Sequence, residues 1–526
     1  MYQMQNNITI LTLDTIRFLL SHVSDHDKIL FLSTSKKINK LKANILFTEN
    51  VANEKICDLW YYDSFTSIIL QNFIPKKCGS VRNFSLGSSE SLTCANLPNI
   101  LNGIIYYFPM PKNLKKIKLS DNFNDSIENV LPYGITHLKF GSKFNKKISD
   151  KNIKYIPPTV THLEFGYHFD QSIKNGIPDS VKHLTFHNNY NKNIYDKKNG
   201  LSYLPPNLLY LKFGECFNKP INNLPIGLNT LIFGDVFNQK IEGCLPNTVK
   251  HLSFGYHFTN DLKNSIPESV TNLILGDNFN ISIQDTLPSS LTHLTFGHSF
   301  NQNIKNMLPV NLVYLKLGRD FNQDITNALP SKLTHLTFGK NFNQDIKDKL
   351  PPNIQHLIFG EQFNHDIKDI LPSNLTHLTF GYNFNTDIAE DLPPNITHLT
   401  FGQKFNKKIK CILPLSLKQL TFGKCFNQNI KKNYLPNLTH LIFGEQFNQS
   451  INDILPPNLT HLTFGCCFNQ DIKDCLPSKI THLTFGSSFD KNIKNCLPPT
   501  LLELTLQRNY RQSICVPAGC IIKLIN

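Results

Sequence analysis

The chain has 526 residues, and 40% of them are hydrophobic, which is enough to build a large core. Its 53 basic and 39 acidic residues give a net charge of +14, but only five of the basic residues are arginine. Proteins that read nucleic-acid sequence rely on the planar guanidinium group of arginine, so the lysine excess indicates solvated surface, and we expect no specific nucleic-acid partner.

The cysteines and the hydropathy give no sign of an extracellular or membrane protein. The 13 cysteines are irregularly spaced and include no Cys-x-x-Cys pair, so we expect apolar fillers in a reducing compartment and no metal site. The N-terminal stretch is interrupted by polar groups, and no apolar run is long enough to span a bilayer. We therefore expect an intracellular protein without a membrane partner.

The N-terminal segment predicts a small helical module. Asp14 is expected to cap a helix that runs to about Ser24. Asp25 and Asp27 begin a second predicted helix that ends near Lys36, where a cation favours the C-terminal end of the helix dipole.

This segment also resembles the F-box, a small helical module that opens with Leu-Pro-x-Glu and continues with spaced apolar residues, an Asp and a Ser-Lys pair. The matching residues are Leu11, Asp14, Ile16, Leu19, Leu20, Ser21, Val23, Asp27, Ile29, Phe31, Ser35 and Lys36. Thr12 and Ile38 stand where the family prefers proline and an aromatic residue. The resemblance implies that residues 8–51 bind a Skp-type adaptor of a cullin–RING ubiquitin ligase. The residues expected at that contact are Leu11, Ile16, Leu19, Leu20, Val23, Ile29, Phe31 and Lys36.

Most of the chain is built from repeats. Each begins with Leu-Pro or Ile-Pro, and nine successive steps from Leu224 to Leu413 have a length of 21 residues. A segment this short cannot bury its own apolar face, so residues 110–506 predict a leucine-rich-repeat-like solenoid of about 19 stacked coils with one parallel β-sheet. Residues 52–109 are expected to form a degenerate N-terminal cap, and residues 507–526 a C-terminal cap.

The repeat LTHLTFGKNFNQDI, taken from the middle of the chain, predicts which side chains form the core. Leu336 and Phe338 alternate with Thr337, as in a half-buried strand. Gly339 is expected where the chain turns through backbone angles that glycine accepts, and Asn343 where stacked asparagines satisfy the backbone groups of a turn. The side chains expected to point inward are Leu333, Leu336, Phe338, Phe342, Ile346 and Leu350.

Units of the form LPxxLTHLxFGxxFNxxI resemble FNIP repeats, a leucine-rich-like family of social amoebae and of giant viruses of amoebae. The resemblance covers about residues 110–515. It departs from the ordinary leucine-rich form in the place of the asparagine that follows the strand. Together the two resemblances imply an F-box and FNIP repeat-containing protein.

Histidine fills one column of the repeat. Its members are His293, His335, His356, His377, His398, His440, His461 and His482. On a strand they should point away from the core, and a spacing of about 4.8 Å is too wide for shared zinc ligation. We expect the rings to stack, to hydrogen-bond neighbouring threonines and to remain mostly neutral.

The two positions between the glycine and the second phenylalanine of each repeat vary most. In successive coils the first of them is Arg319, Lys340, Glu361, Tyr382, Gln403, Lys424 and Glu445. The frame fixes the surrounding positions and leaves these free, so they are candidates for binding a target. Solvent-facing residues without a role are the alternative.

The sequence contains no catalytic constellation, since a Gly-rich phosphate loop, His-Glu-x-x-His and Gly-x-Ser-x-Gly are all missing from it. We therefore expect a non-enzymatic protein without a cofactor. The resemblances imply a substrate receptor of a Skp–cullin–F-box ubiquitin ligase, which holds an unidentified protein target on the solenoid. The alternatives are a protein–protein interaction scaffold without a ligase role and a polyanion binder. We expect residence in the cytoplasm or the nucleus, of the host cell if the protein is viral.

Overall fold

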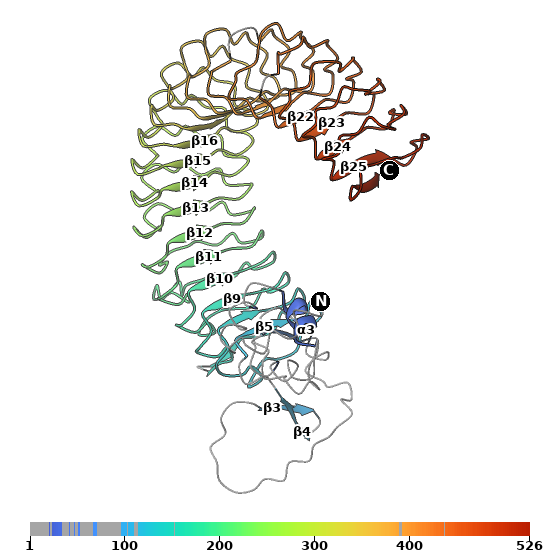
Figure 1. The fold of residues 1–526 in the computed structure, drawn as a ribbon. Helices are drawn as coiled ribbons and strands as arrows, with labels where there is room; N and C mark the ends of the chain where they lie inside the picture. Colours follow the sequence, from blue (N-terminus) through green and yellow to red (C-terminus); the bar gives the residue numbers. More distant parts are fainter. Residues whose placement is uncertain are drawn as a thin grey trace, which may run out of the picture. The chain divides into compact units, whose positions relative to one another are not determined.

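The computed structural model describes residues 20, 24–33, 42, 47, 51–52, 67–70, 96–101, 104–109, 114–151, 153–388, 392–435 and 437–525. The chain divides into two compact units, Met1–Gly255 (unit 1) and Tyr256–Asn526 (unit 2). Within each unit, short parallel strands are stacked, and each strand is followed by a turn and an outer loop before the next begins (Figure 1). The predicted solenoid of stacked coils is confirmed in the described part of both units.

Unit 1 has a parallel sheet in which β1, β2, β5, β6 and β9 to β13 follow one another, with two antiparallel pairs, β3–β4 and β7–β8, outside it. The described elements are α3 (Asp25–Leu32), β1 (Val51–Ala52), β2 (Ser67–Leu70), β3 (Asn96–Leu101), β4 (Ile104–Pro109), β5 (Lys116–Leu119), β6 (His137–Lys139), β7 (Ser149–Asp150), β8 (Ile153–Lys154), β9 (His162–Glu164), β10 (His183–Thr185), β11 (Tyr210–Lys212), β12 (Thr230–Ile232) and β13 (His251–Ser253). The sheet thus begins before the first clear repeat.

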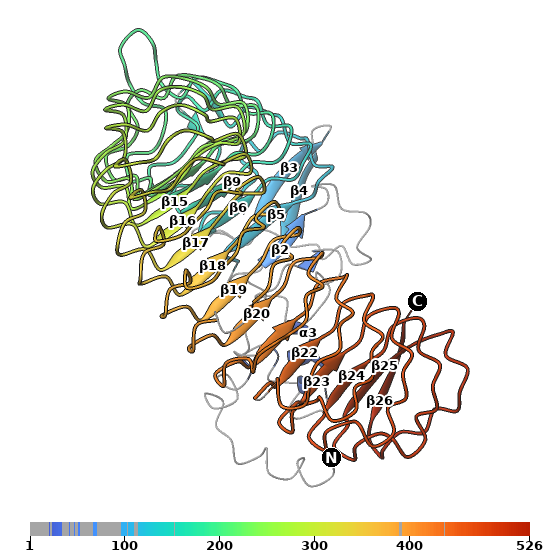
Figure 2. The same cartoon turned by 90° about the horizontal axis from the view of Figure 1, so that it is seen from above.

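Unit 2 is a single parallel sheet in which every strand pairs with the next one along the chain, from β14 to β26. The strands are β14 (Asn272–Ile274), β15 (His293–Thr295), β16 (Tyr314–Lys316), β17 (His335–Thr337), β18 (His356–Ile358), β19 (His377–Thr379), β20 (His398–Thr400), β21 (Gln419–Thr421), β22 (His440–Ile442), β23 (His461–Thr463), β24 (His482–Thr484), β25 (Glu503–Gln507) and β26 (Ile521–Ile525). Figure 2 shows β15 to β20 side by side.

The register places each residue over its equivalent in the next coil. His335 pairs with His356, and Thr337 pairs with Ile358. The sequence columns are therefore also columns in space. The leucine at the centre of each strand, such as Leu336, points to the core and is 1% exposed.

Two rows of phenylalanine form the spine of the core. Within one coil, the rings of Phe338 and Phe342 stack with centroids 3.9 Å apart, and Phe342 lies 6.4 Å from Phe363 in the next coil. All three side chains are buried. The aromatic columns predicted from the sequence are thus core, and they hold each coil to its neighbours by stacking and by the burial of apolar surface.

An asparagine ladder closes the turn after the second phenylalanine. The backbone N–H of Asn343 donates to Oδ1 of Asn322 at 2.9 Å, and Oδ1 of Asn343 accepts from Asn364 at 3.2 Å. The side chain of Gln344 donates to the same Asn322 oxygen at 3.1 Å. This arrangement confirms the predicted ladder, in which the asparagine side chain of one coil accepts a backbone N–H of the following coil.

The glycine after each strand has a different role from the one predicted. Gly339 does not adopt a positive φ; instead, a Cβ at this position would lie 1.6 Å from the backbone oxygen of Gly318 in the coil below. The expected backbone angle is therefore wrong, and the residue is glycine because two coils approach too closely for any side chain. Positive φ angles fall on a column that the sequence did not reveal, such as Asn327 at 55° and Asp348 at 57°.

Two smaller expectations are also wrong. Leu350 is half-buried, although leucines at the same position of other coils, such as Leu413 and Leu435, are buried. Helix α3 ends at Leu32 with Ser33 as its C-cap, well before Lys36. Its N-terminus follows the prediction more closely, since Asp25 and Asp27 occupy the first turn.

The predicted helix that begins at Asp14 lies outside the described residues. Among the helical residues that are described, no segment has the length and hydropathy to cross a membrane.

Candidate binding surface

The strands of unit 2 present two columns of side chains on the face of the sheet opposite the core, called here the open face. In β17 these are His335 and Thr337, on either side of the buried Leu336. Both are half-exposed. The prediction that the histidine column points away from the core is confirmed.

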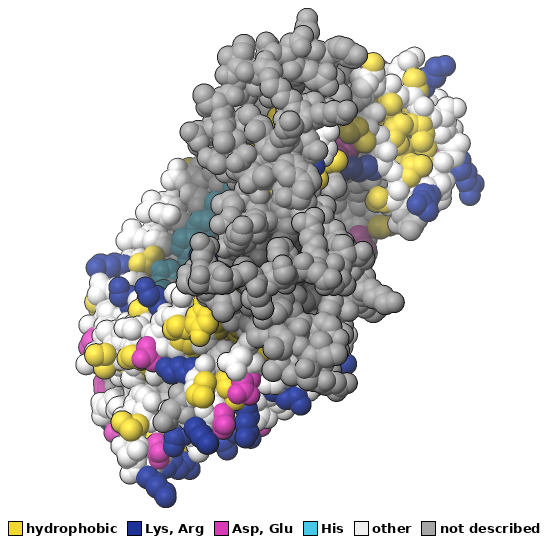
Figure 3. Space-filling view, turned by 90° about the horizontal axis from the view of Figure 1, so that it is seen from below, with side chains coloured by type: hydrophobic (Ala, Val, Ile, Leu, Met, Phe, Trp, Pro, Cys, Tyr) yellow, Lys and Arg dark blue, Asp and Glu magenta, His cyan; other side chains and the backbone are white. Residues whose placement is uncertain are grey.

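The histidine rings stack in two runs. From β17 to β20 the centroids of successive rings are 4.2, 4.1 and 4.1 Å apart, and from β22 to β24 they are 4.2 and 4.3 Å apart. Gln419 separates the two runs. Unit 1 has its own short stack of His137, His162 and His183, with centroids 4.1 and 4.3 Å apart. Figure 3 shows histidine side chains gathered in one patch of the surface.

A threonine precedes most of the stacked histidines and contacts the ring, whereas His356 follows Gln355. Thr376 Oγ1 lies 2.9 Å from Nδ1 of His377 and 3.1 Å from the backbone oxygen of Gln355. The hydroxyl donates to that backbone oxygen, and its contact with Nδ1 holds the ring in a fixed orientation on the open face.

The rings resist protonation. Burial, followed by the charge of neighbouring histidines, lowers the pKa of His356 and lowers the pKa of His377 to about 4. In unit 1, the same causes lower the pKa of His162 to about 4. A second positive ring stacked on the first would be repelled, so these rings are neutral near pH 7, in agreement with the sequence-based expectation.

The predicted target-binding residues form one continuous row, called here the variable row: Arg319, Lys340, Glu361, Tyr382, Gln403, Lys424 and Glu445. Each is exposed at the turn that follows its strand. Backbone hydrogen bonds join successive turns, as from Gln362 N–H to the oxygen of Lys340 at 2.9 Å. The structure thus brings these residues together, and their role in binding remains a prediction.

Side chains of the variable row also contact each other. Lys340 Nζ lies 2.9 Å from Glu361, and Lys424 Nζ lies 2.8 Å from Glu445. These ion pairs are half-exposed, so they contribute little to stability and can exchange partners readily. The variable row therefore offers both signs of charge at the edge of the open face.

Sequence reasoning missed three exposed isoleucines on the open face. Ile274, Ile358 and Ile442 occupy the third strand position, where the other strands from β15 to β24 carry threonine or lysine. They are 47%, 43% and 42% exposed. The signal was present in the sequence as Leu-Ile-Phe-Gly or Leu-Ile-Leu-Gly in place of Leu-Thr-Phe-Gly, but isoleucine there also suits an ordinary strand.

The F-box-like residues are described only in part. Leu20 is 7% exposed and Leu32 is fully buried, while Ile29 and Phe31 are half-exposed and Leu30 is 56% exposed. Helix α3 therefore buries one apolar side and shows another to solvent. The remaining predicted adaptor contacts lie outside the described residues: Leu11, Ile16, Leu19, Val23 and Lys36.

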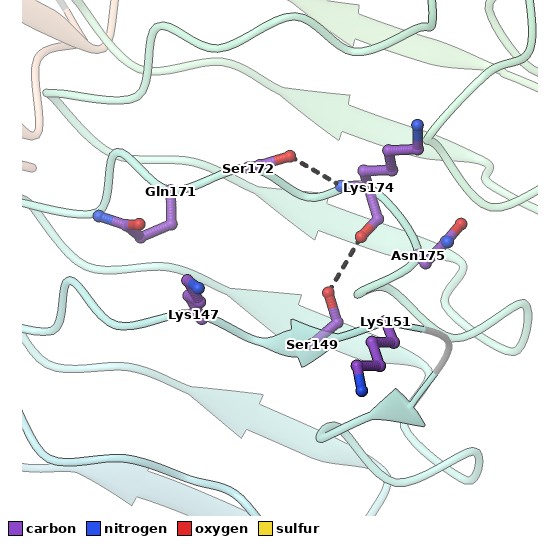
Figure 4. Close-up of a pocket in the computed structure, with 7 residues that line it drawn as sticks. All are labelled: Lys147, Ser149, Lys151, Gln171, Ser172, Lys174 and Asn175. Carbon is purple, nitrogen blue, oxygen red and sulfur yellow. Dashed lines mark hydrogen bonds between the residues drawn. The ribbon is translucent and has the colours of Figure 1, made fainter.

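Unit 1 has a shallow pocket of about 260 Å³ beside the β7–β8 pair. Lys147, Lys151 and Lys174 line it, but their amino groups point in different directions (Figure 4). Lys174 also pairs with Asp196 at 3.4 Å. The pocket therefore does not gather its positive charges around one point where an anion would sit.

No metal-binding cluster of three or more His, Cys, Asp or Glu side chains is present in the part of the chain that the structure describes. Adjacent rings of the histidine column have parallel planes about one strand spacing apart, so their nitrogens point side by side and do not converge.

Comparison with known proteins agrees with this architecture. Two proteins of Acanthamoeba polyphaga mimivirus, named as FNIP repeat-containing, are each 29% identical to this chain, over 184 and 145 residues. The matches cover 31% and 27% of this chain and only 39% and 36% of the relatives. The crystal structure of CroV588, a circular leucine-rich-repeat protein, has a TM-score of 0.62 and 34% identity, and the match covers 92% of this chain and 86% of that one.

The repeats themselves match the model of the FNIP Repeat. The matched residues are 123–168, 169–216, 217–257, 260–299, 300–341, 342–383, 363–392, 384–425, 426–467 and 468–509. These segments make up well over half of the sequence, and each spans the strand, glycine and asparagine positions whose packing is described above. The chain belongs to the FNIP repeat family.

Proposed function

We propose that this protein is a non-enzymatic scaffold that binds a protein partner on the open face and the variable row of its repeats. One observation carries the proposal. The coils from β14 to β24 repeat the same buried frame, while the exposed residues of the variable row differ in charge and size from coil to coil. A frame that is constant inside and varied outside presents a long, specific surface without forming a catalytic pocket.

The chemistry of this surface supports the proposal. Imidazole rings, threonine hydroxyls, exposed isoleucines and paired charges occur along it, and together they match the mixed polar and apolar composition of protein interfaces. Nucleic-acid binding would instead favour a stripe of one sign of charge. The ion pairs of the variable row contain both signs.

Quantitative affinity capture from an Acanthamoeba lysate tests the proposal. The full chain is compared with a variant carrying Lys340→Glu and Lys424→Glu. The control is Lys368→Glu, an exposed lysine on the outer loop. We expect at least one captured protein that the variable-row variant loses and the control retains. Equal capture by all three chains would contradict the proposal, provided that circular dichroism shows them folded.

We further propose that the scaffold is the substrate receptor of a Skp–cullin–F-box ubiquitin ligase, present in the cytoplasm or nucleus of the cell. This proposal rests on the F-box resemblance of residues 8–51. It is supported by helix α3, which leaves Leu30 and Phe31 exposed or half-exposed on a helix whose Leu32 is buried. The partners would be a Skp-type adaptor and a cullin at the N-terminal module and an unidentified protein target on the repeats.

Co-purification with a Skp-type adaptor tests this second proposal. Leu30→Asp places a charge on an exposed position of α3 and should abolish recovery of the adaptor without unfolding the repeats. Lys368→Glu serves again as the control. Recovery of the adaptor at the same level with Leu30→Asp, or no recovery with the wild type, would leave the scaffold without a ligase role.

A further inference from the structure

The exposed isoleucines of unit 2 are evenly spaced along the open face. Strand pairing leads from Ile274 through Thr295, Lys316 and Thr337 to Ile358, which is four coils. A further four coils lead from Ile358 to Ile442. Because parallel strands lie about 4.8 Å apart, neighbouring isoleucines of this set are separated by about 19 Å along the sheet.

An acidic residue accompanies each of these isoleucines. Asp277, Glu361 and Glu445 stand three positions after them, in the turn at the edge of the open face. Each carboxylate has a basic neighbour in an adjacent coil. His298 Nδ1 lies 3.3 Å from Asp277, Lys340 lies 2.9 Å from Glu361, and Lys424 lies 2.8 Å from Glu445. All three carboxylates are at least one-third exposed, so an incoming cation can reach them.

Hydrogen-bonding groups fill the space between the isoleucines. Thr379, Thr400 and Thr421 separate Ile358 from Ile442 in the same column, and all three are half-exposed. The histidine column runs beside them and is half-exposed at His377, His398 and His440. A polypeptide backbone that crossed these strands would therefore meet polar partners between apolar contacts, as a desolvated backbone requires.

The spacing discriminates between peptide conformations. An extended chain advances about 3.3 Å per residue, so six residues span about 20 Å, and because six is even the first and last side chains point to the same side. A helix needs about 13 residues for the same distance, which places the two side chains on nearly opposite sides. The isoleucines match an extended segment and do not match a helix.

We propose that unit 2 binds an extended polypeptide segment that runs across the strands and places apolar side chains, six residues apart and each two residues from a basic residue on the same side of the segment, against Ile274, Ile358 and Ile442. The carboxylates of Asp277, Glu361 and Glu445 pair with the basic residues. This proposal rests on the proposed scaffold function and specifies the class of its partner.

Peptide binding to the full-length protein tests the proposal by fluorescence polarisation. The probe is a fluorescein-labelled peptide of serine and threonine that carries three Leu-Ser-Lys triplets with the leucines six residues apart. The comparison peptide has the same composition with the leucines five residues apart, which turns alternate leucines away. We expect the six-spaced peptide to bind at least about tenfold more tightly. Equal affinity of the two peptides, or no binding of either, would overturn the proposal.

The chain itself supplies the matched variant. Ile274→Thr, Ile358→Thr and Ile442→Thr together insert the residue that most other coils carry at this position, so the fold is preserved while the apolar contacts are removed. The control is Val310→Thr, which removes an apolar side chain from the outer loop that is 70% exposed and so even more accessible than the isoleucines. We expect the triple variant to lose at least about tenfold in affinity for the six-spaced peptide and the control to lose none. Equal affinity of the triple variant and the wild type would overturn the proposal.

The same variants separate this proposal from the scaffold function. If the triple variant captures every lysate protein that the wild type captures, while Lys340→Glu with Lys424→Glu loses one, the scaffold stands and the extended-peptide mode is wrong. If neither variant changes the captured set, the scaffold function itself is wrong. Replacing each lysine of the probe by glutamate should weaken binding to the wild type. Unchanged affinity would show that the three carboxylates do not pair with basic residues of the peptide.

Discussion

At the residue scale, the glycine that follows each strand sets how closely two coils approach. A Cβ on Gly234 would lie 1.9 Å from the backbone oxygen of Gly214, and one on Gly402 would lie 1.6 Å from that of Gly381. The neighbouring atom is backbone and cannot rotate away, as a side chain would. Any substitution must therefore push the coils apart and stretch the hydrogen bonds between them.

Gly234→Ala is predicted to lower the free energy of unfolding by about 3 kcal/mol, because the methyl group overlaps the coil below. The matched control is Gly227→Ala in the same unit, where the nearest atom to the new methyl would be 3.9 Å away. That change should alter stability by less than about 1 kcal/mol. Urea unfolding measures both, and equal losses would contradict the steric explanation.

Tyr190 places a polar hydroxyl group in a column of apolar side chains. Its side chain is fully buried in the row of phenylalanines, and within the described residues its hydroxyl has no hydrogen-bond partner. Tyr190→Phe should therefore raise the free energy of unfolding by about 1 kcal/mol. The reverse change, Phe217→Tyr in the adjacent coil, should lower it. Thermal unfolding of both variants checks the pair, and destabilisation by Tyr190→Phe would show that the hydroxyl does have a partner.

At the scale of the element, the histidine column makes the sheet sensitive to acid. Burial and neighbouring rings lower the pKa of His335 and of His356, and lower that of His377 to about 4. The unfolded chain has no such constraint, so its histidines titrate near their usual pKa of about 6.5. As the pH falls from about 6.5 to about 4, the unfolded state takes up protons that the folded column resists, and stability decreases.

Replacing these three histidines by glutamine should remove part of that pH dependence. The chain already carries glutamine at this position in Gln419, so the sheet tolerates it. Solvent screening limits the effect to about 1 kcal/mol per ring, and the loss of stability between pH 7 and pH 4.5 should shrink by about 3 kcal/mol. Urea unfolding at the two pH values measures the difference. An identical pH dependence in the variant and the wild type would show that the column does not control it.

Ion pairs elsewhere in the chain change their contribution to stability at lower pH. They therefore do not affect the comparison between the histidine variant and the wild type. Hydrogen bonds from Lys349 and Thr326 lower the pKa of Asp324 to about 2, and hydrogen bonds from His187 and Lys139 lower that of Glu164 to about 2. Their contribution is present above the usual carboxyl pKa of about 4 and is lost as the pH falls toward 2. It is common to the variant and the wild type.

At the scale of the whole molecule, repetition made the frame of the fold predictable. Phe342 and Asn343 recur at fixed spacing, and a recurring side chain in a stacked coil meets its own copy in the adjacent coil. The core columns, the asparagine ladder and the outward histidines follow from that fact. The structure of residues outside the repeats could be predicted less well from the sequence. The end of α3 was misplaced, because its last turn depends on tertiary contacts of Leu32 that no pattern in the sequence reveals.

The candidate surface was predictable only in part. The variable row could be found because its residues differ from coil to coil, and the structure places them in one line. The reason for Gly339 could not be found, since a sequence shows the absence of a side chain and not the atom that excludes it. Ile358 was overlooked for a related reason. Its importance lies in the register that sets it four coils from Ile442, and register belongs to the sheet and not to the residue.

The central claim is that a coil is stable only as a layer against its neighbours and that this stacking displays the binding surface. Hydrogen–deuterium exchange of the full chain carrying Gly402→Ala, read by mass spectrometry, tests it most directly. The substitution separates the coil of β20 from that of β19. We predict faster exchange in β19, β20 and β21, fading in the coils beyond. Faster exchange confined to β20, with both neighbours as protected as in the wild type, would show that the coils fold independently and would contradict the account.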